Sequence, residues 1–122
     1  MYITINGDSI GDLIQKTIMD KDEQLLESLS FSIEKDIKNL AKYLEDKGYY
    51  IIMCAGDGLL AKGDIPLNYE ELKNALMALN NGYTFSVGVG QTLEDAYTAL
   101  KYAKLNGRGL IICKQADRFE IM

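Results

Sequence analysis

The chain contains no histidine, and only two of its 122 residues are cysteine. Without imidazole, neither a histidine general base nor a typical zinc site can be built. Acid–base or metal chemistry must therefore depend on carboxylates, which favour Mg²⁺ or Mn²⁺. Cys54 and Cys113 both lie in apolar stretches. This predicts buried free thiols in a reducing, cytoplasmic setting, with a structural disulfide as the minor alternative.

Basic residues and proline are also scarce. Lys and Arg number 13 against 18 Asp and Glu, which gives a formal charge of −5. A duplex-binding domain normally carries a basic face, so no duplex nucleic acid partner is expected, whereas a single nucleotide needs only a few local donors. One proline and no Ser-, Pro- or Gln-rich stretch predict a single domain over residues 1–122. No apolar run is long enough for a bilayer and no basic n-region opens the chain, so neither a membrane partner nor a signal peptide is expected.

The hydrophobic pattern predicts strands and helices in alternation. Strands are expected at 1–6, 49–55, 59–62, 83–89 and 110–113, with 119–121 as a further candidate, and helices at 10–19, 23–47, 69–79 and 93–106. Asn80-Asn81-Gly82 is the stop signal of the third helix. The almost wholly apolar segment 49–55 is typical of a strand buried on both faces. The order β-α-α-β-β-α-β-α-β predicts an α/β (α+β) fold, a ferredoxin-like, mostly antiparallel sheet with helices packed on one side.

Two carboxylates stand out by their positions. Asp8 follows the first strand, and Asp57 lies in the Gly56-Asp57-Gly58 turn, where Asp-Gly favours a tight hairpin. In a β-α-β-β arrangement the first strand lies beside that hairpin, so the two carboxylates can face each other. Such a pair suits Mg²⁺ or Mn²⁺ that also binds substrate phosphates. Taken singly, an Asp before a helix is more often an N-cap, and an Asp before Gly is more often a turn residue.

Two further features favour phosphate binding. Residues 7–11, Gly-Asp-Ser-Ile-Gly, lead from a strand into a helix whose free amides can hold phosphate, although the spacing matches no known phosphate-loop motif. Lys104 and Arg108 lie about one helical turn apart and can form a phosphate clamp. The ordinary alternative is that both cations complement the negative end of the helix.

These segments resemble the GGDEF-type palm over essentially the whole chain. Val87-Gly88-Val89 and the segment from Glu94-Asp95-Ala96 to Lys104-Leu105-Asn106-Gly107-Arg108 are similar to the ending of diguanylate cyclases. Ala55-Gly56-Asp57-Gly58-Leu59 falls where G-G-D-E-F falls, and Asp8 falls where the first-strand metal aspartate falls. In this chain Gly58 replaces the fourth-position acid, and residues 11–22 show no evident counterpart of the Asn and Asp that read guanine. The N-G-D-S-I-G opening and the A-G-D-G hairpin are closer to the minimal CRISPR polymerases, stand-alone relatives of the type III CRISPR palm.

The resemblance implies a nucleotidyltransferase that makes cyclic oligonucleotides of the cyclic di-adenylate type from ATP in anti-phage defence. It implies Asp8 and Asp57 as catalytic metal ligands for Mg²⁺ or Mn²⁺. The implied nucleotide and phosphate contacts are Gly7, Ser9, Ile10, Gly11, Gly56, Gly58, Lys104 and Arg108. One nucleotide site per chain predicts a homodimer, and a separate effector would read the product. Because Gly58 removes an acid, the alternative is a catalytically inactive GGDEF-like nucleotide sensor, and a third reading is an assembly domain without a ligand.

Overall fold

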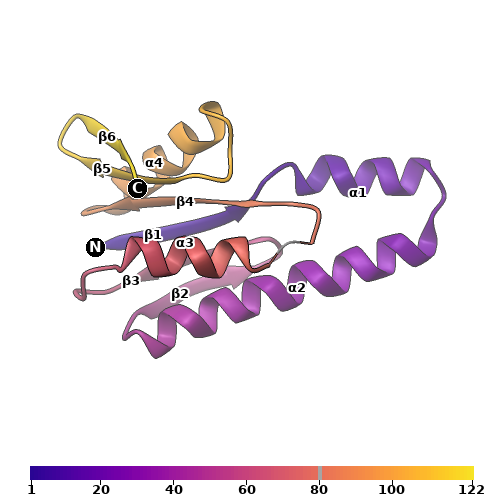
Figure 1. The fold of residues 1–122 in the computed structure, drawn as a ribbon, viewed down its shortest axis with the longest axis horizontal. Coiled ribbons are helices and arrows are strands. Elements are labelled where there is room, and N and C mark those ends of the chain that lie inside the picture. Colours follow the sequence, from indigo (N-terminus) through magenta and orange to yellow (C-terminus); the bar gives the residue numbers. More distant parts are fainter. Residues whose placement is uncertain (80) are drawn as a thin grey trace.

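The elements follow the predicted order in a computed structural model that describes residues 1–79 and 81–122. They are β1 (Tyr2–Gly7), α1 (Ile10–Met19), α2 (Glu23–Asp46), β2 (Tyr50–Ala55), β3 (Gly58–Lys62), α3 (Tyr69–Met77), β4 (Phe85–Gly90), α4 (Leu93–Leu105), β5 (Ile111–Gln115) and β6 (Arg118–Ile121) (Figure 1). The candidate last strand is confirmed as β6. Asn80, part of the predicted stop signal after the third helix, lies outside the described residues.

The sheet has the strand order β2-β3-β1-β4-β5-β6. All neighbouring pairs are antiparallel except β4 and β5, which are parallel. This confirms the predicted α/β fold with a mostly antiparallel sheet. Asn6 near the end of β1 lies opposite Gly58 on one side and Ser86 on the other. The end of β1 is therefore held between the β2–β3 hairpin and β4, where the predicted site residues lie.

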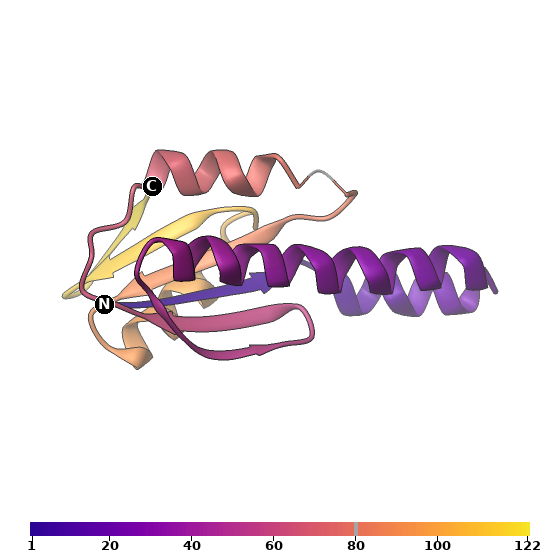
Figure 2. The same ribbon diagram turned by 90° about the horizontal axis from the view of Figure 1, so that it is seen from below.

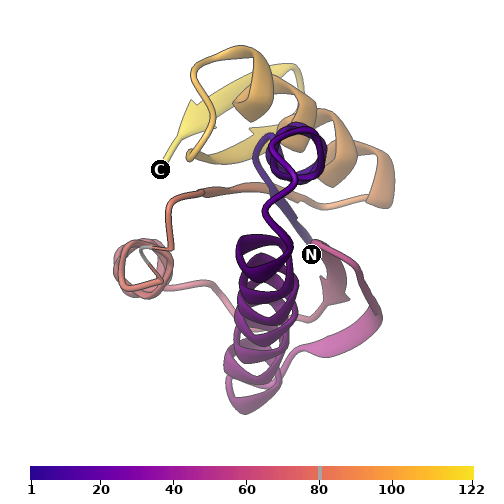
Figure 3. The ribbon, with the colours of Figure 1, turned by 90° about the vertical axis from the view of Figure 1, so that its right-hand side faces the viewer.

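The helices cover both faces of the sheet (Figure 3). Ile3, Val87 and Ile111 pack with α2 and α3 in the main core, whereas Ile112 packs with α4 in a second cluster. The expectation that all helices lie on one side is therefore wrong for α4. The position of α4 follows from β4. Val87 and Val89 point into the main core, and Gly88 between them has no side chain, so the α4 backbone can approach the other face of the sheet.

The strand β2 forms one edge of the sheet and is largely exposed. Tyr50 and Met53 are 66% and 58% exposed. The expectation that this strand is buried on both faces is wrong, because an apolar sequence alone does not distinguish a central strand from an apolar edge. The expected burial of Cys54 is wrong for the same reason, whereas the buried free thiol predicted at Cys113 is confirmed.

The helices α1 and α2 form an antiparallel pair that extends beyond the end of the sheet (Figures 1 and 2). The N-terminus of α2 is capped by the Asp22 carboxylate, which accepts from the Leu25 amide at 3.0 Å. Thr92 caps α4 in the same way, as predicted, with the Asp95 amide at 3.1 Å. α1 begins at the end of β1, directly beside the β2–β3 hairpin. No helix among the described residues is long and apolar enough to cross a bilayer.

Gly88 provides a test of the α4 packing. A Cβ at this position would collide with the Ala96 carbonyl oxygen and the Leu100 amide of α4. We expect Gly88→Ala to lower the free energy of unfolding by at least about 2 kcal/mol, because backbone atoms cannot rotate away as a side chain can. Gly11→Ala is the matched control, since its Cβ would meet nothing within 4 Å and alanine favours helix by up to about 1 kcal/mol. Urea unfolding measures both, and equal stabilities would contradict the packing described.

Candidate functional site

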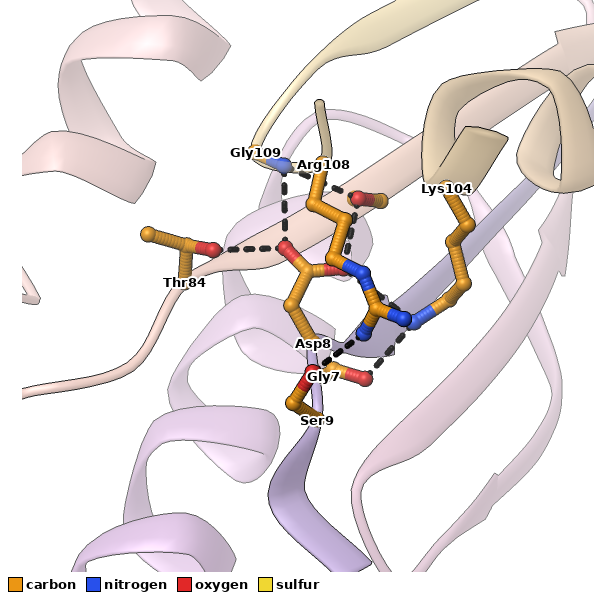
Figure 4. Close-up of polar contacts among 8 residues, drawn as sticks. Gly7, Asp8, Ser9, Thr84, Lys104, Arg108 and Gly109 are labelled. Atoms are coloured by element: carbon orange, nitrogen blue, oxygen red, sulfur yellow. Dashed lines mark hydrogen bonds and ion pairs between the residues drawn. The ribbon is translucent and has the colours of Figure 1, made fainter. Parts of the chain in front are cut away.

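Asp8 is a buried carboxylate at the junction of β1 and α1, with 7% of its surface exposed. Its Oδ1 accepts hydrogen bonds from Ser86 Oγ at 2.6 Å and Lys104 Nζ at 3.1 Å (Figure 4). Its Oδ2 accepts from Thr84 Oγ1 at 2.6 Å and the Gly109 amide at 2.9 Å. A carboxylate offers about four acceptor positions. The protein itself therefore fills all of them.

These contacts hold Asp8 in its charged form. Burial by itself raises the pKa of the carboxyl, but the hydrogen bonds from Ser86, Thr84, Lys104 and Gly109 together outweigh it, so the pKa lies below its ordinary value. At neutral pH a carboxylate and the Lys104 ammonium form an ion pair whose side chains are only 4% and 21% exposed. Removing either partner leaves a largely buried charge without compensation.

The donors around Asp8 demand a carboxylate rather than an amide. Lys104 and the Gly109 amide can only donate, whereas the Ser86 and Thr84 hydroxyls can rotate and accept. Each Asp8 oxygen faces one donor of each kind. An asparagine would have to turn its own NH₂ toward either Lys104 or Gly109. The hydrogen-bond donors around position 8 therefore favour aspartate over asparagine.

The two predicted phosphate cations meet the β1–α1 corner from α4 and the loop after it. Lys104 Nζ donates to the Gly7 carbonyl oxygen at 2.8 Å as well as to Asp8. The Arg108 guanidinium donates to Ser9 Oγ (Figure 4). Ser9 and Arg108 both have left-handed backbones, with φ of 56° and 64°. Such conformations cost free energy in residues other than glycine and often mark functional sites.

The Arg108 guanidinium lies at the N-terminus of α1, where a positive charge is unfavourable. Ser9 is the N-cap residue of α1, but no side chain caps this helix. The first amides of a helix carry a partial positive charge, which repels a cation and attracts an anion. Arg108 beside Ser9 therefore adds positive charge to an end that is already positive. An anion bound at this corner would satisfy the helix and the guanidinium together.

A cavity of about 510 Å³ lies on the opposite side of the sheet, between α1, α2 and the β2–β3 hairpin. Its apolar wall consists of Ile10, Ile14, Ile33 and Ile37. Ser30, Glu34 and Lys38 on α2 supply polar groups, and Glu34 pairs with Lys38 at 2.7 Å. Residues 54–57 of the hairpin close the remaining side. The cavity thus combines an apolar wall with a few polar groups at its rim.

Asp57 lies at the mouth of this cavity, in the two-residue loop between β2 and β3. Positive φ falls on Gly56, at 57°, so the turn depends on Gly56 rather than on the Asp57-Gly58 step that we expected. The Gly7 amide donates to the Asp57 carbonyl oxygen at 2.9 Å. A Cβ at Gly7 would lie 3.1 Å from Asp57 Oδ2, so this carboxylate lies directly over Gly7.

Asp8 and Asp57 make different contacts. Asp8 contacts Lys104 of α4, whereas Asp57 borders the cavity formed with α1 and α2. Their pairing at a metal stays a prediction. Within the described residues, no three carboxylate, histidine or cysteine side chains gather as metal ligands. Protein donors fill the four acceptor positions of Asp8, so a metal bound to this carboxylate would have to displace at least one of them.

The predicted glycines lie at the corner for different reasons. A Cβ at Gly7 would collide with Ile10, and one at Gly58 would lie 2.9 Å from Asn6 Nδ2. Gly11 opens onto the cavity without any such contact. The sequence analysis missed Thr84, Ser86 and Gly109 as partners of Asp8. Ser86 could have indicated this site, because it is a polar residue in an otherwise apolar strand. Every residue of that strand, β4, is buried.

The fold and the corner together define a palm-type α/β domain with a cationic strand–helix junction beside an apolar cavity. A family model described as the minimal CRISPR polymerase domain (mCpol) matches residues 2–113. The chain therefore belongs to the minimal CRISPR polymerase family, which confirms the resemblance found in the sequence. Membership implies a CRISPR-associated palm polymerase of the nucleotidyltransferase type. A search of curated proteins gave no match.

The same isosteric change at the two acids should have different effects on stability. We expect Asp8→Asn to lower the free energy of unfolding by about 3 kcal/mol, because the asparagine NH₂ must then face the Lys104 or Gly109 donor and the largely buried Lys104 ammonium loses its counter-ion. Asp57→Asn should change it by less than about 0.5 kcal/mol, since asparagine serves this turn equally well. Guanidinium unfolding at neutral pH compares the two. An Asp8→Asn protein as stable as Asp57→Asn would refute the four-donor arrangement.

The lowered pKa of Asp8 also sets a pH dependence. Its contribution to stability is present above the unfolded-state value of about 3.9 and is lost as the pH falls through the lower folded-state pKa. The stability difference between the wild type and Asp8→Asn should therefore be constant from neutral pH to about pH 5 and shrink below about pH 4. Unfolding curves at a series of pH values measure this difference. A gap that widens on acidification would contradict the assignment.

Proposed function

We propose that this protein is a nucleotidyltransferase that joins ATP into a cyclic oligonucleotide of the cyclic di-adenylate type, as a signal in defence against phage. The observation that carries the proposal is the cavity beside an uncapped helix N-terminus and Arg108, in a chain of the minimal CRISPR polymerase family. These features supply, side by side, an apolar place for a base and a cationic place for its phosphates. The product would be read by a separate effector.

The cavity supports binding of the nucleobase. About 510 Å³ lies within the range of about 300–1,000 Å³ found for small-molecule sites. The four isoleucines offer an apolar wall against which a purine ring can pack. At the rim, the Glu34 carboxylate is an acceptor for an exocyclic amine and Lys38 is a donor for a ring nitrogen. ATP is favoured because residues 11–22 show no evident counterpart of the guanine-reading Asn and Asp of the diguanylate cyclases.

The β1–α1 corner supports binding of the triphosphate. The amides of Ser9, Ile10 and Gly11 belong to the start of α1, and Ile10 and Gly11 also line the cavity. A nucleotide with its base against the isoleucines therefore has its phosphates at the helix N-terminus. Gly56 and Asp57 line the same cavity, which supports a role for the Asp57 carboxylate next to the bound nucleotide.

The reaction joins two nucleotides. A ribose hydroxyl of one attacks the α-phosphate of the other, so that an O–P bond forms, the bond to pyrophosphate breaks and the hydroxyl proton is released to solvent. The protein's residues contribute by holding both reactants in line, which can supply much of the rate. Because the cavity described above takes one nucleotide, we propose that two copies of the chain supply the two nucleotides. Palm polymerases generally use divalent metal ions, so Mg²⁺ and Mn²⁺ belong in the assay.

The direct test is incubation of the purified protein with each of the four nucleoside triphosphates and either Mg²⁺ or Mn²⁺. We expect pyrophosphate release and a cyclic product from ATP, identified by mass spectrometry. Asp57→Asn is the sharper variant, since it should fold normally yet lose activity by orders of magnitude if its carboxylate acts on the bound nucleotide. Absence of any oligonucleotide with all four substrates and both metals would refute the enzyme.

A nucleotide sensor without catalysis is the second candidate. Two observations favour it, namely Gly58 in place of the motif acid and the complete engagement of Asp8 by protein donors. A sensor would bind ATP and be stabilised against heat in proportion to ligand concentration, but would release no pyrophosphate. Measuring the melting temperature and pyrophosphate in the same samples separates the two functions, and a shift without turnover would favour the sensor.

A further inference from the structure

We infer that two copies of this chain associate through the outer face of α2, with the two helices antiparallel and the two Phe31 side chains close to the two-fold axis. This pairing rests on the proposed function in one respect, that two copies bring two nucleotides together, and it names the surface at which they meet. The evidence for the surface lies in α2 alone, so the pairing can be measured without nucleotide.

The outer face of α2 carries an exposed aromatic residue. Leu29, Ile33 and Ile37 belong to the buried face of this helix, whereas Phe31 is 69% exposed. In Figure 2, α2 crosses the front of the sheet, and no other described element lies over its outer face. Hollows of about 520 and 430 Å³ adjoin Phe31 toward the start and toward the end of the helix. The ring therefore projects beside hollows into which a second ring can pack.

The charges on this face change sign at Phe31. Glu27 lies one helical turn before it and Lys35 one turn after it, and both are exposed. Within the described residues, neither side chain forms an ion pair. They are about 12 Å apart along the helix, so they do not neutralise each other. A single exposed apolar residue is ordinary on a protein surface, and it is this charge pattern that points to a partner.

A second copy of the chain matches the pattern. In a two-fold pair each surface meets its own counterpart. When two α2 helices run antiparallel about Phe31, Glu27 of each copy faces Lys35 of the other, whereas parallel helices would place like charges together. Such pairs set partner and orientation more than affinity, and the two rings supply the apolar contact. Because one helix face is a small interface, we expect a dissociation constant on the order of 10–100 μM.

The pairing would also bring the two nucleotide cavities to one helix pair. Glu34 and Lys38 line the cavity and also the hollow beside Phe31. The rim of each cavity is therefore next to the proposed contact. Pairing through α2 leaves the hairpin and the β1–α1 corner of both copies uncovered.

The first test removes the aromatic contact. We expect Phe31→Ser to weaken self-association at least about tenfold, because an aromatic residue at the centre of an interface contributes most of its affinity. Tyr97→Ser is the matched control, since Tyr97 on α4 is also an exposed aromatic, at 58%, and lies outside the proposed contact. Sedimentation velocity without nucleotide measures association over concentrations that bracket the expected constant, and circular dichroism confirms that each variant is folded.

The second test exchanges the charges. Glu27→Lys and Lys35→Glu each place like charges opposite one another, so each variant alone should self-associate at least about tenfold more weakly than the wild type. In a mixture of the two variants every facing pair is again opposite in sign, so a heterodimer of near wild-type affinity should form. Charges that act only within their own helix cannot produce this complementation. Added salt should weaken the wild-type pair.

Three results would overturn the inference: a wild type that stays monomeric throughout, a Phe31→Ser protein that associates like the wild type, or a mixture that binds no tighter than its components. Failure of the proposed function is a different outcome, in which the copies pair as described but release no pyrophosphate. A monomer that still makes the cyclic product would refute this surface and leave the enzyme standing.

Discussion

The buried carboxylate of Asp8 is the interaction on which the functional corner depends. Its donors come from Thr84 and Ser86 at β4, from Lys104 on α4 and from Gly109 in the loop before β5, up to 101 residues away in the sequence. One side chain thus joins the end of β1 to three segments that reach it from other parts of the chain. Without this carboxylate the end of α4 and the loop that carries Arg108 would lose their common anchor, and the corner would no longer be defined.

Gly7 links the two sides of the sheet at this corner. Its carbonyl oxygen accepts from Lys104 on the α4 side, and its amide donates to the Asp57 carbonyl oxygen of the hairpin. Because it has no side chain, Ile10 and the Asp57 carboxylate pack directly over it. The cationic group and the apolar cavity therefore approach each other across a single residue. A nucleotide that spans both needs this closeness, which any larger residue at position 7 would remove.

The hydrophobic pattern predicted the helices and strands well. It did not predict which face of the sheet each helix covers or which strand lies at the edge. The spacing of apolar residues predicted the first helix at 10–19, and the structure has it at Ile10–Met19. The location of α4 depends on which face of β4 Gly88 leaves open, and periodicity cannot show this when both faces are buried. The apolar segment 49–55 has the sequence of a central strand. In the sheet order β2 has β3 as its neighbour on one side and therefore lies at the edge. Asp8 and Asp57 follow neighbouring segments of the sheet as predicted, yet Asp8 contacts α4 whereas Asp57 lines the cavity beside α1 and α2.

Because Asp8 and Asp57 make different contacts, an enzyme and a nucleotide sensor would depend on different residues of this chain. Asp8 cannot bind a substrate or metal without giving up the counter-ion of Lys104 or one of the two acceptors of the Gly109 amide. Gly58 supplies no carboxylate, so Asp57 is the acid of the resemblance that remains on the cavity side. Its backbone is held by the Gly7 amide and by a two-residue turn that needs glycine at position 56. In the proposed enzyme Asp57 would be the carboxylate that holds a divalent metal ion at the bound nucleotide, whereas a sensor needs only the cavity and the cationic corner. The two functions therefore separate at one side chain, Asp57, whose replacement by asparagine we expect to leave the fold unchanged.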